Sequence, residues 1–178
     1  MKTALLVAFL CTILGRAWSQ SEEKNVIKIN PLSALVGAGS MFYENKIDTK
    51  HSWQIGFSYM GPILRGIKCT GLAITPEYRI YLKNNALSGT YFGPYVRYKN
   101  YMIKTSENDK ETYTSFGGGV VCGHQWVYKS GFVLDLFAGP CFNSSRIEIN
   151  SGSPDIVMPG LGSGGFGLRV GIALGFGF

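Results

Sequence analysis

Charged side chains of both signs recur at alternate positions in several stretches that switch between apolar and polar residues. Glu77 and Arg79, for example, lie two residues apart in one such stretch. In a stretch with a period of two, these residues share one face. Opposite charges on an enclosed face can form ion pairs, so we predict a network of Glu44, Glu77, Arg79, Arg97, Asp135 and Arg169, with Gln125 beside it. Gating or ion conduction by the same charges is the alternative.

The two histidines are weak candidates for catalysis. A barrel enzyme acting on lipids would need serine, histidine and an acid grouped on one face. Neither His51 nor His124 has a serine two residues further on, and each lies near a short turn. We predict no catalytic residues, and we interpret both histidines as side chains at headgroup level.

Other motifs for cofactors are absent or out of context. Gly160–Gly165 matches G-x-G-x-x-G, but a loop precedes it and a strand follows, whereas a dinucleotide site needs a strand before and a helix after. Cys69, Cys122 and Cys141 lack the spacing of a zinc site or a disulfide framework. We predict no cofactor and no metal, and we leave a single Cys69–Cys141 bridge as the alternative to three free thiols.

The composition favours a single β-rich domain. The 178 residues include 24 glycines, 13% aromatic residues and only 16% charged residues, which argues against disorder and against a coiled coil. The net charge of +6 is not concentrated in a basic run, so nucleic acid is not a predicted partner. After residue 14 no apolar run approaches the ~20 residues of a membrane-spanning helix.

The first 19 residues have the pattern of a secretory signal peptide. Lys2 precedes an apolar stretch at Ala4–Leu14, and small residues follow at Ala17 and Ser19. We predict cleavage before Gln20, which leaves residues 20–178 as one barrel domain.

The rest of the chain alternates with a period of two. In the last stretch the apolar residues from Leu168 to Phe178 alternate with Arg169, glycines and Ala173. We predict eight strands, at residues 25–35, 38–45, 51–61, 69–83, 90–103, 112–127, 132–147 and 164–178. Because proline removes a ladder donor, we expect a bulge, a strand end or a misplaced boundary at Pro31, Pro76, Pro94 and Pro140.

Connection lengths and side-chain types predict a membrane barrel. Short turns join the second and third, fourth and fifth, and sixth and seventh strands, whereas longer segments join most of the others, as in outer-membrane barrels. The small and charged face suits a narrow lumen. Aromatic residues near strand ends predict interfacial girdles composed of Tyr43, Trp53, Tyr59, Tyr78, Tyr91, Tyr98, Trp126, Phe132 and Phe176. Phe176 and Phe178, on the apolar face of the last strand, predict a signal for the barrel-assembly machinery.

The motifs of the central strands resemble those of a known family. Pro76–Leu82, Gly89–Tyr95, Gly117–Trp126 and Phe132–Leu136 are similar to stretches of small secreted proteins of unknown function, found mainly in the Bacteroidota and regarded as outer-membrane barrels. The resemblance covers most of residues 26–178, and the general plan is similar to OmpA/OmpX-type barrels. It implies location and fold and carries over no catalytic residue.

Together these patterns predict an all-β, eight-stranded, antiparallel, up-and-down barrel in a bacterial outer membrane. We expect a structural or surface-interaction role and not an enzyme. The expected partners are the lipid bilayer, the assembly machinery and a surface partner at the long loops. Two alternatives stay open: a narrow channel, and a soluble, lipocalin-like binder of a small apolar ligand.

Overall fold

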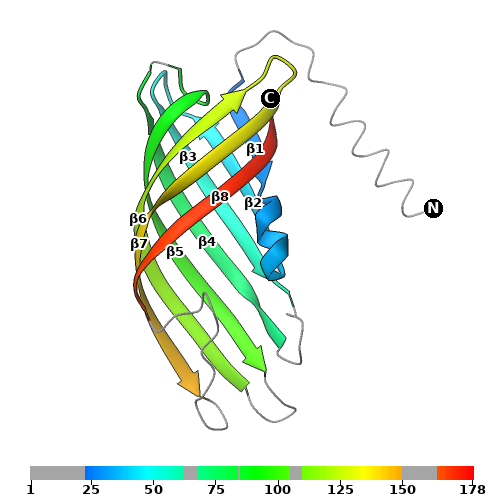
Figure 1. Ribbon diagram of the computed structural model, residues 1–178, viewed down its shortest axis with the longest axis vertical. Coiled ribbons are helices and arrows are strands. Elements are labelled where there is room, and N and C mark those ends of the chain that lie inside the picture. The colour runs from blue at the N-terminus through cyan, green and yellow to red at the C-terminus, as the bar shows by residue number, and fades with distance from the viewer. Residues whose placement is uncertain (1–22, 62–67, 84, 105–109, 150–163) are drawn as a thin grey trace, which may run out of the picture.

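The computed structural model describes residues 23–61, 68–83, 85–104, 110–149 and 164–178. Eight strands and one short 3₁₀ helix make up this part of the chain (Figure 1). The predicted signal peptide lies outside the described residues. The elements are β1 (Asn25–Ile29), η1 (Pro31–Val36), β2 (Ala38–Lys46), β3 (His51–Met60), β4 (Lys68–Tyr81), β5 (Gly89–Lys104), β6 (Lys110–Val127), β7 (Phe132–Ile149) and β8 (Gly165–Gly177).

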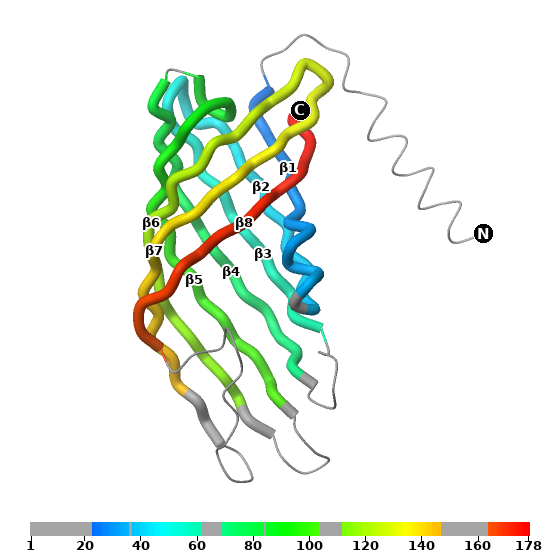
Figure 2. The backbone as a smooth tube through the Cα atoms, in the orientation of Figure 1, coloured from blue at the N-terminus to red at the C-terminus, as the bar shows by residue number. Residues whose placement is uncertain are grey.

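The strands close into one antiparallel barrel in which each strand pairs with its neighbours in the sequence. Antiparallel pairing of β1 with β8 completes the ring, so that the start of β1 lies beside the C-terminus (Figure 2). The backbone N–H of Asn25 donates to the carbonyl oxygen of Phe178 at 2.9 Å, which fixes the two ends together. The predicted eight-stranded antiparallel barrel is therefore confirmed.

The first strand is shorter than the sequence predicted. It ends at Ile29, and η1 takes the place of predicted strand residues 31–35. The Asn30 side chain accepts the N–H of Leu32, Pro31 begins the helix, and Gly37 ends it in the left-handed conformation at φ 72°. Asparagine is favoured as a helix N-cap, proline in the first helical turn and glycine just after the last turn. These three residues therefore favour a helical turn over a strand.

The short β1 leaves a seam in the barrel wall. β8 pairs with β1 only from Leu174 to Gly177, although it pairs with β7 from Gly165 to Phe176. Along the rest of that edge η1 lies between β8 and β2 and contacts both. We call this stretch of wall, flanked by η1 and residues 165–173, the β8 seam.

The prolines act differently from the prediction. Pro31 coincides with the end of a strand, as one of the expected outcomes allowed. Pro76, Pro94 and Pro140 instead lie inside β4, β5 and β7 without bulging them. The β4–β5 register, for instance, is the same on both sides of Pro76 and Pro94, and only the pairs around them are missing. Each proline therefore interrupts one ladder locally, while its strand keeps its other partner.

Polar and charged side chains are buried in the interior beside aromatic and small apolar ones, and large apolar side chains cover the exterior. The buried polar residues are Lys28, Glu44, Ser52, Gln54, Thr75, Glu77, Arg79, Ser115, Gln125, Asp135 and Arg169. The apolar face of β8 is exposed instead, with Leu168 71% and Val170 60% accessible. Charges inside and large apolar side chains outside differ from a soluble barrel, whose exterior is polar and whose core is apolar.

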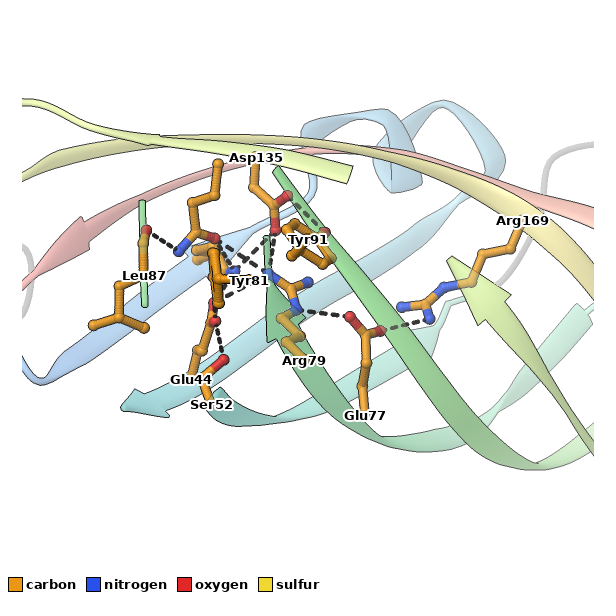
Figure 3. A network of polar contacts seen from close by, with 11 residues as sticks. Glu44, Ser52, Glu77, Arg79, Tyr81, Leu87, Tyr91, Asp135 and Arg169 are labelled. Atoms are coloured by element: carbon orange, nitrogen blue, oxygen red, sulfur yellow. Dashed lines mark hydrogen bonds and ion pairs between the residues drawn. The ribbon is translucent and has the colours of Figure 1, made fainter. Parts of the chain in front are cut away.

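Aromatic pairs bracket the outer apolar band on β7 and β8. Phe132 pairs with Phe176 near one end, and Phe142 pairs with Phe166 further along the same two strands. The ten-residue separation on each strand matches the 9–11 residues with which a tilted strand crosses the hydrocarbon core. Tyr91 is a correction to the predicted girdle, because it is only 1% exposed and points inward (Figure 3).

The short turns meet at one end of the barrel, the upper end in Figure 1. There the β4–β5 turn folds Ala86 and Leu87 into the mouth, where both are buried and Leu87 packs with Val26 and Val133. The longer connecting segments, 62–67, 105–109 and 150–163, lie outside the described residues. In the part of the chain that the structure describes, no helix has both the length and the apolar character needed to cross a membrane.

Candidate functional site: a charge network inside the barrel

A network of ion pairs lies inside the barrel, and Gln125 connects it to the Leu87 carbonyl oxygen of the β4–β5 turn (Figure 3). Lys28 lies at its centre, with no accessible surface. Its Nζ donates to Glu44 Oε2 at 2.6 Å and to Asp135 Oδ2 at 2.9 Å. It also donates to Gln125 Oε1 at 2.6 Å. One cation from β1 thus joins β2, β6 and β7 across the barrel.

Arg79 is the second centre and is also fully buried. Its Nη1 donates to Glu44 Oε2 at 3.1 Å and to Asp135 Oδ2 at 2.9 Å, the same two oxygens that Lys28 contacts. Its Nε donates to Glu77 Oε1 at 2.7 Å. The guanidinium stacks over the Tyr91 ring, 4.1 Å from the centroid, which adds a cation–π contact between two buried side chains.

Hydroxyl groups satisfy the remaining oxygens of two carboxylates. Glu44 Oε1 accepts from Ser52 at 2.6 Å and from Tyr81 at 2.7 Å. Asp135 Oδ1 accepts from Tyr91 at 2.8 Å. Every oxygen of these two buried carboxylates therefore has a donor, which offsets the cost of removing them from water.

Arg169 extends the network toward the other end of the lumen. Its Nη1 donates to Glu77 Oε2 at 2.7 Å, and its guanidinium lies over the rings of Tyr95 and Phe137, 4.3 and 4.9 Å from their centroids. With Lys28 and Arg79 it makes three cations, which face the three carboxylates Glu44, Glu77 and Asp135. The network is therefore balanced in charge.

Strand alternation places these side chains and explains which of them the sequence reveals. Five of the six residues proposed from the sequence lie in the network: Glu44, Glu77, Arg79, Asp135 and Arg169. Arg97 faces the same lumen but stands apart, with its Nε donating to Thr75 Oγ1 at 2.9 Å. Sequence reasoning missed Lys28 because β1 is only five residues long, although its place between the apolar Ile27 and Ile29 was the available signal.

Glycine gives Tyr91 the room to reach Asp135. A Cβ added to Gly123 would lie 2.5 Å from the Tyr91 hydroxyl oxygen and 2.8 Å from the carbonyl oxygen of Leu136. We expect Gly123→Val to destabilise the barrel by about 1–3 kcal/mol, because the ring and the β7 backbone must both shift. The urea concentration that unfolds the purified barrel measures this. Gly39→Val is the control, since nothing lies within 4 Å of a Cβ there; equal stability of the two variants would contradict the close contact.

The structure does not bring either histidine to the network. His51 Nδ1 lies 2.7 Å from Asp48 Oδ2 at the exposed β2–β3 turn, whereas the neighbouring Ser52 points inward to Glu44. Hydrogen bonds from the Lys50 backbone N–H and the His51 ring hold the pKa of Asp48 below its ordinary value. His124 contacts Thr90 at 2.8 Å and packs against Trp126.

The remaining predicted features are placed as follows. Cys69, Cys122 and Cys141 are free thiols. Most of the glycine motif at 160–165 lies outside the described residues. Phe176 and Phe178 lie at the closing strand, where the Phe178 backbone N–H donates to the Asn25 carbonyl oxygen at 2.8 Å.

A comparison with known protein families places this chain in one of them. The model of a family of proteins of unknown function, DUF3575, matches residues 4–148, which reach from the first residues of the chain into β7. No curated protein and no solved structure matches the chain.

Proposed function

The chain belongs to the DUF3575 family of proteins of unknown function, and we propose that it is an integral barrel of a bacterial outer membrane with a structural or surface-interaction role. One observation carries the proposal: charged side chains fill the interior while large apolar side chains cover the exterior. Water would favour the opposite arrangement, whereas lipid favours this one.

Features at the two ends support the same assignment. The aromatic pairs Phe132–Phe176 and Phe142–Phe166 are separated by the thickness of a bilayer core. The short turns, the start of β1 and the C-terminus share one end of the barrel, which we assign to the periplasm. The longer connections then belong to the outer surface, where a partner would bind. Phe178, 54% exposed at the end of the closing strand, suits recognition by the assembly machinery.

The lumen weighs against both alternatives. A lipocalin-like binder needs an apolar interior cavity, but the centre of this barrel holds three carboxylates and three cations. A channel needs a continuous path, whereas the same six side chains and Leu87 are all buried inside this barrel. We therefore favour a plugged barrel.

Cell fractionation combined with gel electrophoresis tests this proposal. We expect the protein in the outer-membrane fraction, and we expect the unboiled sample to migrate faster than the boiled one because a closed barrel resists detergent. Recovery of the protein in the soluble fraction with no heat-dependent shift would refute a membrane barrel. An outer-membrane protein of known fold serves as the control for the fractionation.

A further inference from the structure

A cavity lies in the lumen beyond the charge network, toward the long-connection end. Its volume is about 450 Å³, and its lining includes the three basic residues Arg97, Lys99 and Arg169 together with Tyr95 and Tyr113. We call it the basic vestibule. Arg97 and Arg169 both lie over the Tyr95 ring, 5.7 and 4.3 Å from its centroid. One aromatic ring thus gathers two guanidinium groups at the floor of the cavity.

Among the described residues, the lining of the basic vestibule includes no carboxylate, unlike the charge network below it. Within the described residues, no carboxylate forms an ion pair with Arg97 or Lys99. Arg169 is only 6% exposed, and its Nε and Nη2 are buried without a hydrogen-bond partner. Buried donors of a cation are costly to leave unpaired. An anion bound between these side chains would pair them.

A second cavity adjoins the basic vestibule at the β8 seam. It has a volume of about 390 Å³ and shares Arg97, Leu168 and Arg169 with the basic vestibule. Inward-facing Phe42 and Phe137 line one part of it. Outward-facing residues Leu168 and Val170 line another, as does Leu32 of η1. Residues from both faces of β8 thus line one cavity.

The second cavity coincides with the β8 seam. From Gly165 to Ala173 the β8 backbone has no β1 partner, and η1 stands in for the missing strand. Unpaired backbone at membrane depth is tolerated where it lines a cavity or is covered by protein. The seam is therefore a place where an apolar chain can leave the lumen sideways.

We propose that the basic vestibule binds the anionic head of a single-chain amphiphile, a carboxylate or phosphate, while the acyl chain leaves through the β8 seam into the bilayer. Arg97, Lys99 and the free donors of Arg169 hold the head, and Phe42, Phe137 and the outer apolar residues of the seam contact the chain. A soluble anion would use the basic residues but not the seam. This inference rests on the proposed membrane location, since the chain must end in lipid.

The test uses the full-length protein in phosphatidylcholine nanodiscs. Radiolabelled palmitate is the probe, and lysophosphatidate, acetate and inorganic phosphate are the competitors. We expect saturable palmitate binding that lysophosphatidate displaces and the two soluble anions do not. The double variant Arg97→Gln/Lys99→Gln should bind palmitate at least about tenfold more weakly. Lys83→Gln/Lys129→Gln, which removes two exposed charges at the other end, should bind as the unmodified protein does.

A second variant tests the route of the chain. Ser40 lines the second cavity, and its hydroxyl oxygen forms a 2.9 Å hydrogen bond with the Ser58 hydroxyl. Ser40→Phe should fill this space and weaken palmitate binding by about tenfold, with Arg97 and Lys99 unchanged. Palmitate binding that is unaffected by Ser40→Phe would overturn the seam route.

The outcomes separate this inference from the proposed function. Every sample is first checked for the heat-dependent gel shift of a membrane-inserted barrel. A shifted barrel that binds no palmitate, or that binds it equally well without Arg97 and Lys99, overturns the ligand proposal alone. Displacement of palmitate by phosphate or acetate at similar concentrations overturns the role of the acyl chain. Failure to insert into the bilayer refutes the membrane location itself.

Discussion

Arg79→Met should destabilise the barrel by roughly 3–5 kcal/mol, because it removes one partner from a buried ion-pair network. Arg79 donates to Glu44, Glu77 and Asp135 and has no accessible surface. Without it, Lys28 and Arg169 face three carboxylates that water cannot reach. The free energy of unfolding in urea, followed by the loss of the heat-dependent gel shift, measures the effect.

Two further variants separate charge balance from lost volume. Arg97→Met removes a lumen arginine that pairs with no carboxylate among the described residues, so its stability should change by less than about 1 kcal/mol. Arg79→Met/Asp135→Asn restores two cations facing two carboxylates and should recover part of the loss. If Arg97→Met proved as damaging as Arg79→Met, the network would not be what holds the lumen together.

Leu136→Arg should lower the free energy of unfolding in a bilayer by about 2–4 kcal/mol, the range for a basic residue on the lipid face at mid-depth. Leu136 is on the outer face, pairs with Ile172, and lies between the two aromatic pairs of β7 and β8. The stability of the barrel refolded into phospholipid vesicles measures this cost.

Leu82→Arg is the matched control for depth. Leu82 is 70% exposed and follows the last residue of β4, at the short-turn end. A basic residue near the interface should lower the free energy of unfolding by only about 0–1 kcal/mol. In a water-soluble barrel neither arginine would be buried in lipid, so equal and small effects at Leu136 and Leu82 would contradict the membrane assignment.

Alternation in the sequence predicted the strands because each face of a closed barrel has one environment along its whole length. The apolar positions of β8 illustrate this, since one rule places all of them on the outside. The same rule failed at residues 31–35, where local cap chemistry dominates. Asn30, Pro31 and Gly37 satisfy a helical turn at little cost, and no pattern of period two records that preference.

Partners inside the lumen could not be predicted in the same way. Lys28 and Asp135 are 107 residues apart and meet only because the ring closes. Alternation assigns Arg97 to the same face as Arg79, but the register of β4 and β5 places it beyond reach of the carboxylates of the network. The face on which a side chain lies follows from its position in one strand. Its ion-pair partners depend on the register between strands and on the closure of the barrel.

Tyr91 shows how residue type can mislead where alternation does not. Its position near a strand end suggested an interfacial aromatic residue, yet it shares its parity with the inward-facing Gly93 and Tyr95. The structure follows the parity, and the Tyr91 hydroxyl becomes a donor to Asp135. Aromatic residues on the inward parity of such barrels are better read as parts of the lumen.

Quenching of tryptophan fluorescence by brominated lipids tests most directly whether the apolar exterior faces a bilayer. Trp53 and Trp126 lie on the outer face near the short-turn end, 40% and 37% exposed, and they are the only tryptophans in residues 20–178. In vesicles, we predict that lipids brominated near the headgroup quench both residues more strongly than lipids brominated deep in the chain. Fluorescence quenched by aqueous iodide but not by either lipid would show that this face is in water and would contradict the membrane barrel.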